Sequence, residues 1–187
     1  DLDSILPGLT DDDKEMILRI VDKGVNSPLT SSVGRLFDVV AAMMGFQGKI
    51  SSPAEAAIGL QAMAKDGIKD CYSYEIKEWQ LGFGPMFGEI LADIKGGKNN
   101  GEIAAMFHNA LAQGSIEMCN RIREDNGVED VVLSGGVFYN SLVNDLIVGG
   151  LQNSGFNVYT HAILPPGDVC LSLGQAVIAC VKEKLCV

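Results

Sequence analysis

A short glycine-containing segment in the last third of the chain has the residue types of a phosphate-binding loop. Residues 134–136 (Ser-Gly-Gly) lie between an apolar run that is typical of a strand, residues 131–133, and a segment with helical periodicity. Two adjacent glycines, Gly135 and Gly136, allow a phosphate to approach the backbone, and free amides at such a turn attract anions. The same residues also suit a tight strand-to-helix turn, and on the glycines alone the turn is the favoured interpretation.

Asn140 and Asp168 are polar residues that can meet at the same place. In parallel sheets ligands bind beyond the carboxyl ends of the strands, where Asn140 follows the glycines and Asp168 follows residues 164–167 (Leu-Pro-Pro-Gly). Asn140 can hydrogen-bond a ligand hydroxyl, and it can equally cap a helix. Asp168 can hold a metal ion or its bound water, although by itself helix capping is the favoured role.

Arg35 and Asp38 lie three residues apart on an expected helix and therefore share a face. They are the polar exceptions among apolar neighbours. Most such pairs are solvated surface ion pairs, so a ligand role for these two residues needs independent support.

The histidines and cysteines form no recognisable site in the sequence. His108 lies inside a long expected helix, where a lone histidine is usually packed, and His161 follows a strand. There is no Ser/His/Asp set, Cys/His pair, pair of catalytic carboxylates or local zinc spacing. The five cysteines include no Cys-x-x-Cys pair, so no disulfide framework is expected. They are interpreted as core residues of a protein in the reducing cytoplasm.

The elements that must position these residues follow from capping signals and apolar periodicity. Thr10 with its three following aspartates, and residues 52–55 (Ser-Pro-Ala-Glu), are helix-start signals. Residues 77–84 are expected to form an irregular connection. The pattern predicts helices from residue 10 to 24 and over about 32–44, 52–65, 85–94, 101–124, 140–152 and from 168 onward, with strands over 71–76, 131–133 and 156–160.

The last third predicts a β-α-β unit. Its two strands are joined by one helix, so they should be parallel with a right-handed crossover. Because residues 131–133 are all apolar, that strand is expected to be covered on both faces. No linker is evident, so one domain is expected over residues 1–187, mainly helical over 1–125 and β-α-β over 126–187.

Size and charge limit the classes of partner. The 187 residues suit one domain. Acidic residues number 24 against 14 basic ones, and the net charge of −10 repels phosphate backbones, so no nucleic-acid partner is expected. No apolar run approaches the roughly 18 residues of a membrane helix, and the first residues lack the charged-then-apolar pattern of a leader, so neither a signal peptide nor a membrane partner is expected.

Five segments of the sequence together form a recognisable pattern. The most specific are residues 28–38 (Pro-Leu-Thr-Ser-Ser-Val-Gly-Arg-Leu-Phe-Asp) and residues 132–140 (Val-Leu-Ser-Gly-Gly-Val-Phe-Tyr-Asn). Residues 103–109 (Ile-Ala-Ala-Met-Phe-His-Asn), 164–168 (Leu-Pro-Pro-Gly-Asp) and 173–176 (Leu-Gly-Gln-Ala) support them. Together the segments resemble the carbamoyltransferase HypF family of [NiFe]-hydrogenase maturation factors. They occur in the family order and span most of the chain.

This resemblance implies an α/β fold, the C-terminal lobe of an actin-like ATPase of the sugar kinase/Hsp70/actin type, helix-rich with a small parallel β-α-β core. It implies an enzyme that uses ATP, Mg²⁺ and carbamoyl phosphate to form carbamoyl adenylate. The carbamoyl group then passes to the C-terminal cysteine of HypE as the precursor of a cyanide ligand. Family members carry acylphosphatase-like, zinc-finger and YrdC-like domains upstream, and because the chain begins at Asp1 without Met, the natural chain is expected to extend upstream too.

The resemblance also assigns roles to individual residues. Arg35 and Asp38 would lie near the ribose or the carbamoyl end of the nucleotide. Asp168 would be the aspartate of a metal site, for Fe or Zn, that an upstream histidine pair completes, so that this chain alone would be inactive. The residues that would contact the nucleotide itself are Gly34, Gly135, Gly136 and Asn140.

Two segments depart from the family pattern. After Asp168 the family commonly has two glycines, whereas this chain has Val169 and Cys170. Side chains there would crowd an approaching phosphate. Before the third helix the family often has a Tyr-Glu-Gly-Gln-like run, whereas this chain has Ser-Pro-Ala-Glu at residues 52–55. Both departures predict an altered nucleotide affinity.

Two alternatives remain open at this stage. A tRNA threonylcarbamoyl transferase would share the glycine loop and Asp168, but an acidic residue is usual in that family where this chain has Arg35, and the net charge of −10 gives tRNA little to hold. The other alternative is a non-catalytic interaction lobe. Its apolar helix faces would favour self-association, which predicts a homodimer.

Overall fold

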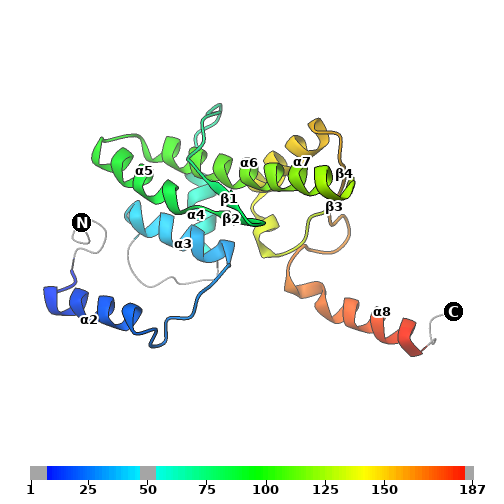
Figure 1. The fold of residues 1–187 in the computed structure, drawn as a ribbon, viewed down its shortest axis with the longest axis horizontal. Helices are drawn as coiled ribbons and strands as arrows, with labels where there is room; N and C mark the ends of the chain where they lie inside the picture. Colours follow the sequence, from blue (N-terminus) through cyan, green and yellow to red (C-terminus); the bar gives the residue numbers. More distant parts are fainter. Residues whose placement is uncertain (1–7, 47–53, 184–187) are drawn as a thin grey trace. The chain divides into compact units, whose positions relative to one another are not determined.

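The chain divides into two compact units, Asp1–Met63 and Ala64–Val187. The computed structural model describes residues 8–46 and 54–183 (Figure 1). The predicted functional division at residue 125 differs from this boundary and stays a prediction. No helix in the described ranges is long and apolar enough to cross a membrane.

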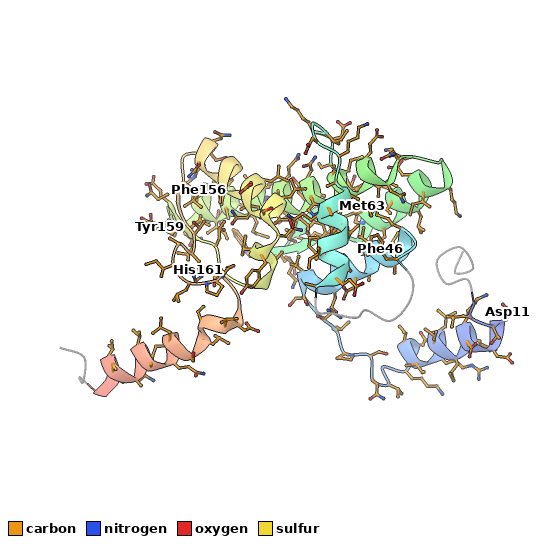
Figure 2. All side chains as sticks on the ribbon, turned by 180° about the vertical axis from the view of Figure 1, so that it is seen from behind. Asp11, Phe46, Met63, Phe156, Tyr159 and His161 are labelled. Carbon is orange, nitrogen blue, oxygen red and sulfur yellow. The ribbon has the colours of Figure 1, made fainter. Side chains whose placement is uncertain are left out.

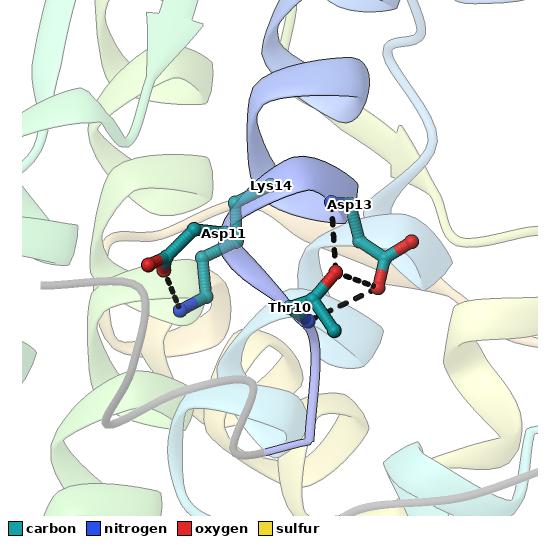
Figure 3. A network of polar contacts seen from close by, with 4 residues as sticks. All are labelled: Thr10, Asp11, Asp13 and Lys14. Atoms are coloured by element: carbon teal, nitrogen blue, oxygen red, sulfur yellow. Dashed lines mark hydrogen bonds and ion pairs between the residues drawn. The ribbon is translucent and has the colours of Figure 1, made fainter.

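The first unit contains the helices α2 (Asp11–Asp22), α3 (Val33–Met43) and α4 (Glu55–Met63). Helix α2 begins where predicted, because Thr10 and Asp13 form a reciprocal capping box (Figure 3). The Thr10 hydroxyl accepts from the Asp13 amide at 3.2 Å, and the Asp13 carboxylate accepts from the Thr10 amide at 3.0 Å. Gly24, at φ +63°, follows the last turn as expected.

Helices α3 and α4 pack together and provide the buried apolar residues of this unit, among them Phe37, Val40 and Leu60. Gly59 on α4 lies close to Phe46 just after α3, where a β-carbon would approach the ring to 2.5 Å. Helix α4 ends at Met63, two residues before the predicted end. The predicted cap residues Ser52 and Pro53 lie outside the described residues.

The second unit is built on α6 (Asn100–Asn126), which packs against α5 (Gly84–Lys95) and α7 (Ser141–Asn153). Asn99 caps the start of α6, and Gly127, at φ +68°, ends it. The interior of α6 is buried over most of its first half, including Ile103 and Phe107. The remaining elements are η1 (Gly136–Tyr139), η2 (Asp168–Cys170) and α8 (Leu171–Glu183).

A hairpin replaces the strand and irregular connection that the sequence predicts over residues 71–84. Only Glu75–Lys77 forms β1, and it pairs antiparallel with β2 (Gln80–Gly82). The two turn residues, Glu78 and Trp79, both have positive φ (+46° and +65°), as a two-residue type I′ turn requires. Tyr72 is buried, although it precedes the strand.

The predicted β-α-β unit is confirmed. β3 (Asp130–Val132) pairs in parallel with β4 (Asn157–Tyr159), and α7 lies between them in the chain. The expected coverage of β3 on both faces is wrong, because Val132 is 70% exposed whereas Val131 is half-buried. Successive side chains point to opposite faces of a strand, so helical cover on one face leaves the other open.

The four cysteines of the described ranges are half-buried and not, as predicted, core residues. The thiol of Cys71, for example, donates a hydrogen bond to the side-chain oxygen of Gln113 at 3.2 Å.

Candidate functional site

The glycine loop leaves the carboxyl end of β3 and is held by the loop that follows β4. The buried Leu133 extends the pairing of the strands by donating to the Tyr159 carbonyl at 2.9 Å. Gly135 then adopts φ +110° and donates its amide to the Pro166 carbonyl at 2.7 Å. A side chain is strained at that φ, so glycine is needed here for the backbone. The predicted tight strand-to-helix turn is confirmed.

Gly136 differs from Gly135 because it does not have the positive φ that requires glycine. A β-carbon on Gly136 would have no heavy atom within 4 Å, and the residue is exposed. The first hydrogen bond of η1 runs from the Phe138 amide to the Gly135 carbonyl, so the amides of Gly136 and Val137 precede it. Amides that precede the first bond of a helical turn point outward and can meet an anion.

The loop after β4 closes over the glycine loop on the same edge of the sheet. His161, labelled beyond Tyr159 in Figure 2, lies 3.2 Å from the Ser134 hydroxyl through Nε2. Gly167 is buried under the ring of Tyr139, where a β-carbon would come within 2.6 Å of Cε2. The two loops therefore meet, as their position after parallel strands predicted.

Asp168 stands at the exposed end of this arrangement. It is the first residue of η2 and is exposed, while Gly167 occupies the capping position before it. The interpretation of Asp168 as a helix cap is therefore wrong, and its carboxylate lies instead in the first turn of η2. The next residue, Val169, is 75% exposed.

Asn140 caps α7 and is buried. Its side-chain oxygen accepts the Val143 amide at 3.1 Å, and its amide nitrogen lies 3.0 Å from Nε2 of His108. The capping role is confirmed, and the contact with a nucleotide stays a prediction. His108 is fully buried, as expected for a packed helical histidine, and this burial lowers its pKa despite the bond between Nδ1 and the Ala104 carbonyl.

Arg35 and Asp38 lie in the first unit, on one face of α3 as predicted. Their side chains form an ion pair at 2.8 Å between Nη1 and Oδ2. The arginine side chain is 66% exposed and the aspartate 22%, and Oδ2 is inaccessible to solvent. Gly34, one residue earlier, is exposed in the first turn of α3.

The candidate residues thus fall into two sets. Gly34, Arg35 and Asp38 belong to the first unit, whereas the glycine loop, Asn140 and Asp168 belong to the second. Within the second unit the structure brings the glycine loop to the segment that precedes Asp168. Within residues 8–46 and 54–183, no group of three histidine, cysteine, aspartate or glutamate side chains is placed to hold a metal ion.

Three contacts of this site were missed by sequence reasoning: His108 with Asn140, His161 with Ser134, and Tyr139 with Gly167. Each joins residues 27 or more positions apart. The sequence signal that could have found the first is the presence of both His108 and Asn140 in segments that resemble the same family.

Comparison with known proteins identifies the family. Residues 3–175 match the family described as "Carbamoyltransferase, Kae1-like Domain, second subdomain". The chain belongs to the HypF carbamoyltransferase family. The resemblance seen in the sequence is therefore confirmed.

The HypF relatives are similar along most of this chain. The carbamoyltransferase HypF of Rhodobacter capsulatus is 33% identical over 174 residues, which is 90% of this chain and 22% of that protein. The probable carbamoyltransferase HypF of Methanocaldococcus jannaschii is 28% identical over 87% of this chain and 21% of its own length. This chain therefore spans about a fifth of these curated relatives.

Two solved HypF structures share the fold. A full-length HypF in a phosphate- and nucleotide-bound form superposes with a TM-score of 0.87 and 32% identity, covering 94% of this chain and 24% of that one. HypF of T. kodakarensis superposes with a TM-score of 0.79 and 26% identity, covering 95% of this chain and 23% of that one. The fold is thus the helix-rich mixed α/β fold of this part of HypF.

Proposed function

We propose that this chain forms one wall of the nucleotide site of a HypF-type carbamoyltransferase. The whole protein would use ATP, with Mg²⁺, and carbamoyl phosphate to form carbamoyl adenylate in the cytoplasm. It would then pass the carbamoyl group to the C-terminal cysteine of a HypE-like protein. The lobe would be the C-terminal lobe of an actin-like ATPase, in which nucleotides bind between two lobes.

One observation carries this proposal: the amides of Gly136 and Val137, which precede the first hydrogen bond of η1, follow the carboxyl end of a parallel strand. Backbone amides in such a turn can bind phosphate without a cationic side chain. The absence of a β-carbon at Gly136 leaves room for phosphate oxygens to approach. The nucleotide-bound HypF that shares this fold supports the same assignment.

The chain's own residues would bind and orient the substrate. The glycine loop would hold the phosphates, and Gly135 would keep the loop in place through its bond to Pro166. Arg35 and Asp38, with Gly34 beside them, would act at the ribose or the carbamoyl end. The exposed Val169 would narrow the approach to the phosphates, which predicts weaker ATP binding than in relatives with glycine there.

A complete metal site does not fit the residues of this chain. Asp168 offers one exposed carboxylate, and within the described ranges no other two ligand side chains join it. Divalent transition metals in proteins take at least three protein ligands.

The test is a calorimetric titration of ATP and Mg²⁺ into the full natural protein and two glycine variants. Gly136→Ala should keep the fold, since its β-carbon meets open space, but should weaken ATP binding on the order of tenfold, because a methyl group would hold the phosphate away. Gly88→Ala on α5 is the matched control, since its β-carbon also meets nothing within 4 Å. Equal ATP affinity in all three proteins would reject the glycine loop as the phosphate site.

A further inference from the structure

A buried chain of hydrogen bonds joins the middle of α6 to the glycine loop. On α6, Nδ1 of His108 lies 2.7 Å from the Ala104 carbonyl, and Nε2 lies 3.0 Å from the Asn140 side-chain nitrogen. Asn140 also accepts the Val143 amide at 3.1 Å. His108 is fully buried and Asn140 is 6% exposed, so solvent does not substitute for these bonds.

The direction of each bond follows from its fixed partner. The Val143 amide can only donate, so the oxygen of the Asn140 side chain faces it, and the NH₂ group must face His108. Nε2 of His108 must therefore accept, which places the ring proton on Nδ1. The Ala104 carbonyl can only accept, and it receives that proton. All three bonds are satisfied only by this neutral tautomer and this amide orientation.

Asn140 continues the chain into the loop through its backbone. Its amide donates to the Val137 carbonyl at 3.0 Å, and the Phe138 amide donates to Gly135 at 3.1 Å. Gly135 in turn donates to Pro166 at 2.7 Å. Asn140 therefore joins the buried His108 to the end of η1, the turn that begins with Gly136 and Val137.

We propose that His108 is a positioning residue for the nucleotide, acting through Asn140 without touching the ligand. As the acceptor for the Asn140 amide, it holds residues 134–140 in the form whose amides meet the phosphates. This inference rests on the proposed nucleotide site. It gives Asn140 the same role, because both polar groups of its side chain are engaged within the protein.

The alternative is that His108 only fills space beside Phe107, whose ring it meets edge-on at 5.5 Å. Three variants separate these roles. His108→Leu fills the same space with an apolar side chain but removes the Nε2 acceptor. His108→Gln keeps an acceptor near the position of Nε2. Asn140→Ser cuts the same bond from the other side, since serine retains a cap for Val143 but does not reach His108.

The experiment combines two measurements on the full natural protein and these variants, with Ile147→Val as a control for a small loss of core packing on α7. ATP affinity is measured by calorimetry. Hydrogen exchange of the Gly135 amide is measured by NMR without nucleotide. His108→Leu and Asn140→Ser should each weaken ATP binding on the order of tenfold and speed the exchange of the Gly135 amide. His108→Gln should restore both to within about threefold of the wild type, and Ile147→Val should change neither.

Three results would overturn the proposal. The first is an unchanged exchange rate of the Gly135 amide in His108→Leu, and the second is failure of His108→Gln to restore that rate. The third is an effect of Ile147→Val on exchange and ATP affinity as large as that of His108→Leu. If the wild type binds no ATP, the proposed function fails, and the exchange of the Gly135 amide alone then decides whether His108 positions the loop. Faster exchange rescued by glutamine would support that role without any nucleotide.

Discussion

The Cα atom of Gly167 lies so close to the Tyr139 ring that a β-carbon at position 167 would come within 2.6 Å of Cε2. This contact closes the loop after β4 over the glycine loop. Gly167→Ala must push the ring outward, which is feasible because Tyr139 is 56% exposed. We expect the free energy of unfolding to fall by about 1 kcal/mol, at the low end of overpacking costs. Urea unfolding of the variant and the wild type would measure it.

The control for this change is Gly167→Ala in a Tyr139→Ala background. Without the ring, the added methyl group should cost less than in the wild type. An equal loss of unfolding free energy in both backgrounds would show that the Tyr139 ring is not what disfavours a β-carbon at position 167.

A second close approach joins α6 and α7. A β-carbon on Gly150 would overlap the end of the Ile116 side chain, Cδ1 first and then Cγ1 at 3.1 Å. Gly150→Ala should therefore lower the free energy of unfolding by roughly 1–3 kcal/mol, although alanine is the better helix former. Ile116→Val removes the overlapping methyl group, so the double variant should recover most of the loss. Thermal unfolding of the wild type, the two single variants and the double variant would measure this. No recovery of stability in the double variant would contradict the overlap of Gly150 with Ile116.

The hairpin turn predicts a gain in stability. Trp79 adopts φ +65°, a conformation that costs a residue with a side chain about 1–2 kcal/mol relative to glycine. Trp79 is 56% exposed, so little packing is lost on its removal. Trp79→Gly should therefore raise the free energy of unfolding by up to about 1 kcal/mol. The control is Gln80→Gly in the extended strand that follows, which should lower the free energy of unfolding. Urea unfolding would measure both variants. A change of the same sign in both would show that the positive φ of Trp79 is not what limits stability here.

This turn also shows why part of the fold could not be predicted. Two-residue hairpin turns are recognised by Asn-Gly or Asp-Gly, and here Glu78 and Trp79 occupy the turn. The strand β2 therefore carries no local signal. Where caps and periodicity agree, as at Thr10 and in the β-α-β unit, the prediction and the structure coincide.

The candidate site divides in the same way. The glycine turn and the Asn140 cap have local sequence signals, the residue type of Gly135 and the three-residue spacing of Asn140 and Val143, and the sequence predicted both. The bond from Asn140 to His108 and the contact of Tyr139 with Gly167 depend on how α6 and the two loops pack. No spacing within one segment encodes such contacts. The exposure of Val132 was not predicted, because three apolar residues in a row do not indicate which face of the strand a helix covers.

The ion pair of Arg35 with Asp38 can be tested for function separately from stability. Asp38 Oδ2 is inaccessible to solvent and is paired with Arg35, so Arg35→Met should lower the free energy of unfolding by about 1–3 kcal/mol, because the buried oxygen loses its partner. If the pair serves the nucleotide site, the same variant in the full natural protein should weaken ATP binding or slow carbamoyl transfer. The charge-swapped variant Arg35→Asp/Asp38→Arg keeps an ion pair. Recovery of full activity in the swap would indicate that the pair is only structural.

The buried His108 predicts a dependence of stability on pH. Burial lowers its pKa in the folded protein below the value of 6.5 that it has when exposed. Between these two values the unfolded chain binds more protons than the folded one, so the free energy of unfolding should fall as the pH drops below about 6.5. The slope contributed by one proton is at most about 1.4 kcal/mol per pH unit. At a pH well above the pKa of the free imidazole, the full contribution of the neutral His108 to stability is present.

The measurement is urea unfolding from about pH 8 to about pH 5 for the wild type and His108→Gln. Carboxylates also titrate toward the acid end of this range, but they are common to both proteins. The difference between the two curves therefore isolates His108. Burial of a neutral ring with Nδ1 donating to Ala104 requires the wild type to lose stability faster on acidification. Parallel curves would mean that the folded protein takes up the proton as readily as the unfolded chain, which the acceptor role of Nε2 toward Asn140 does not allow.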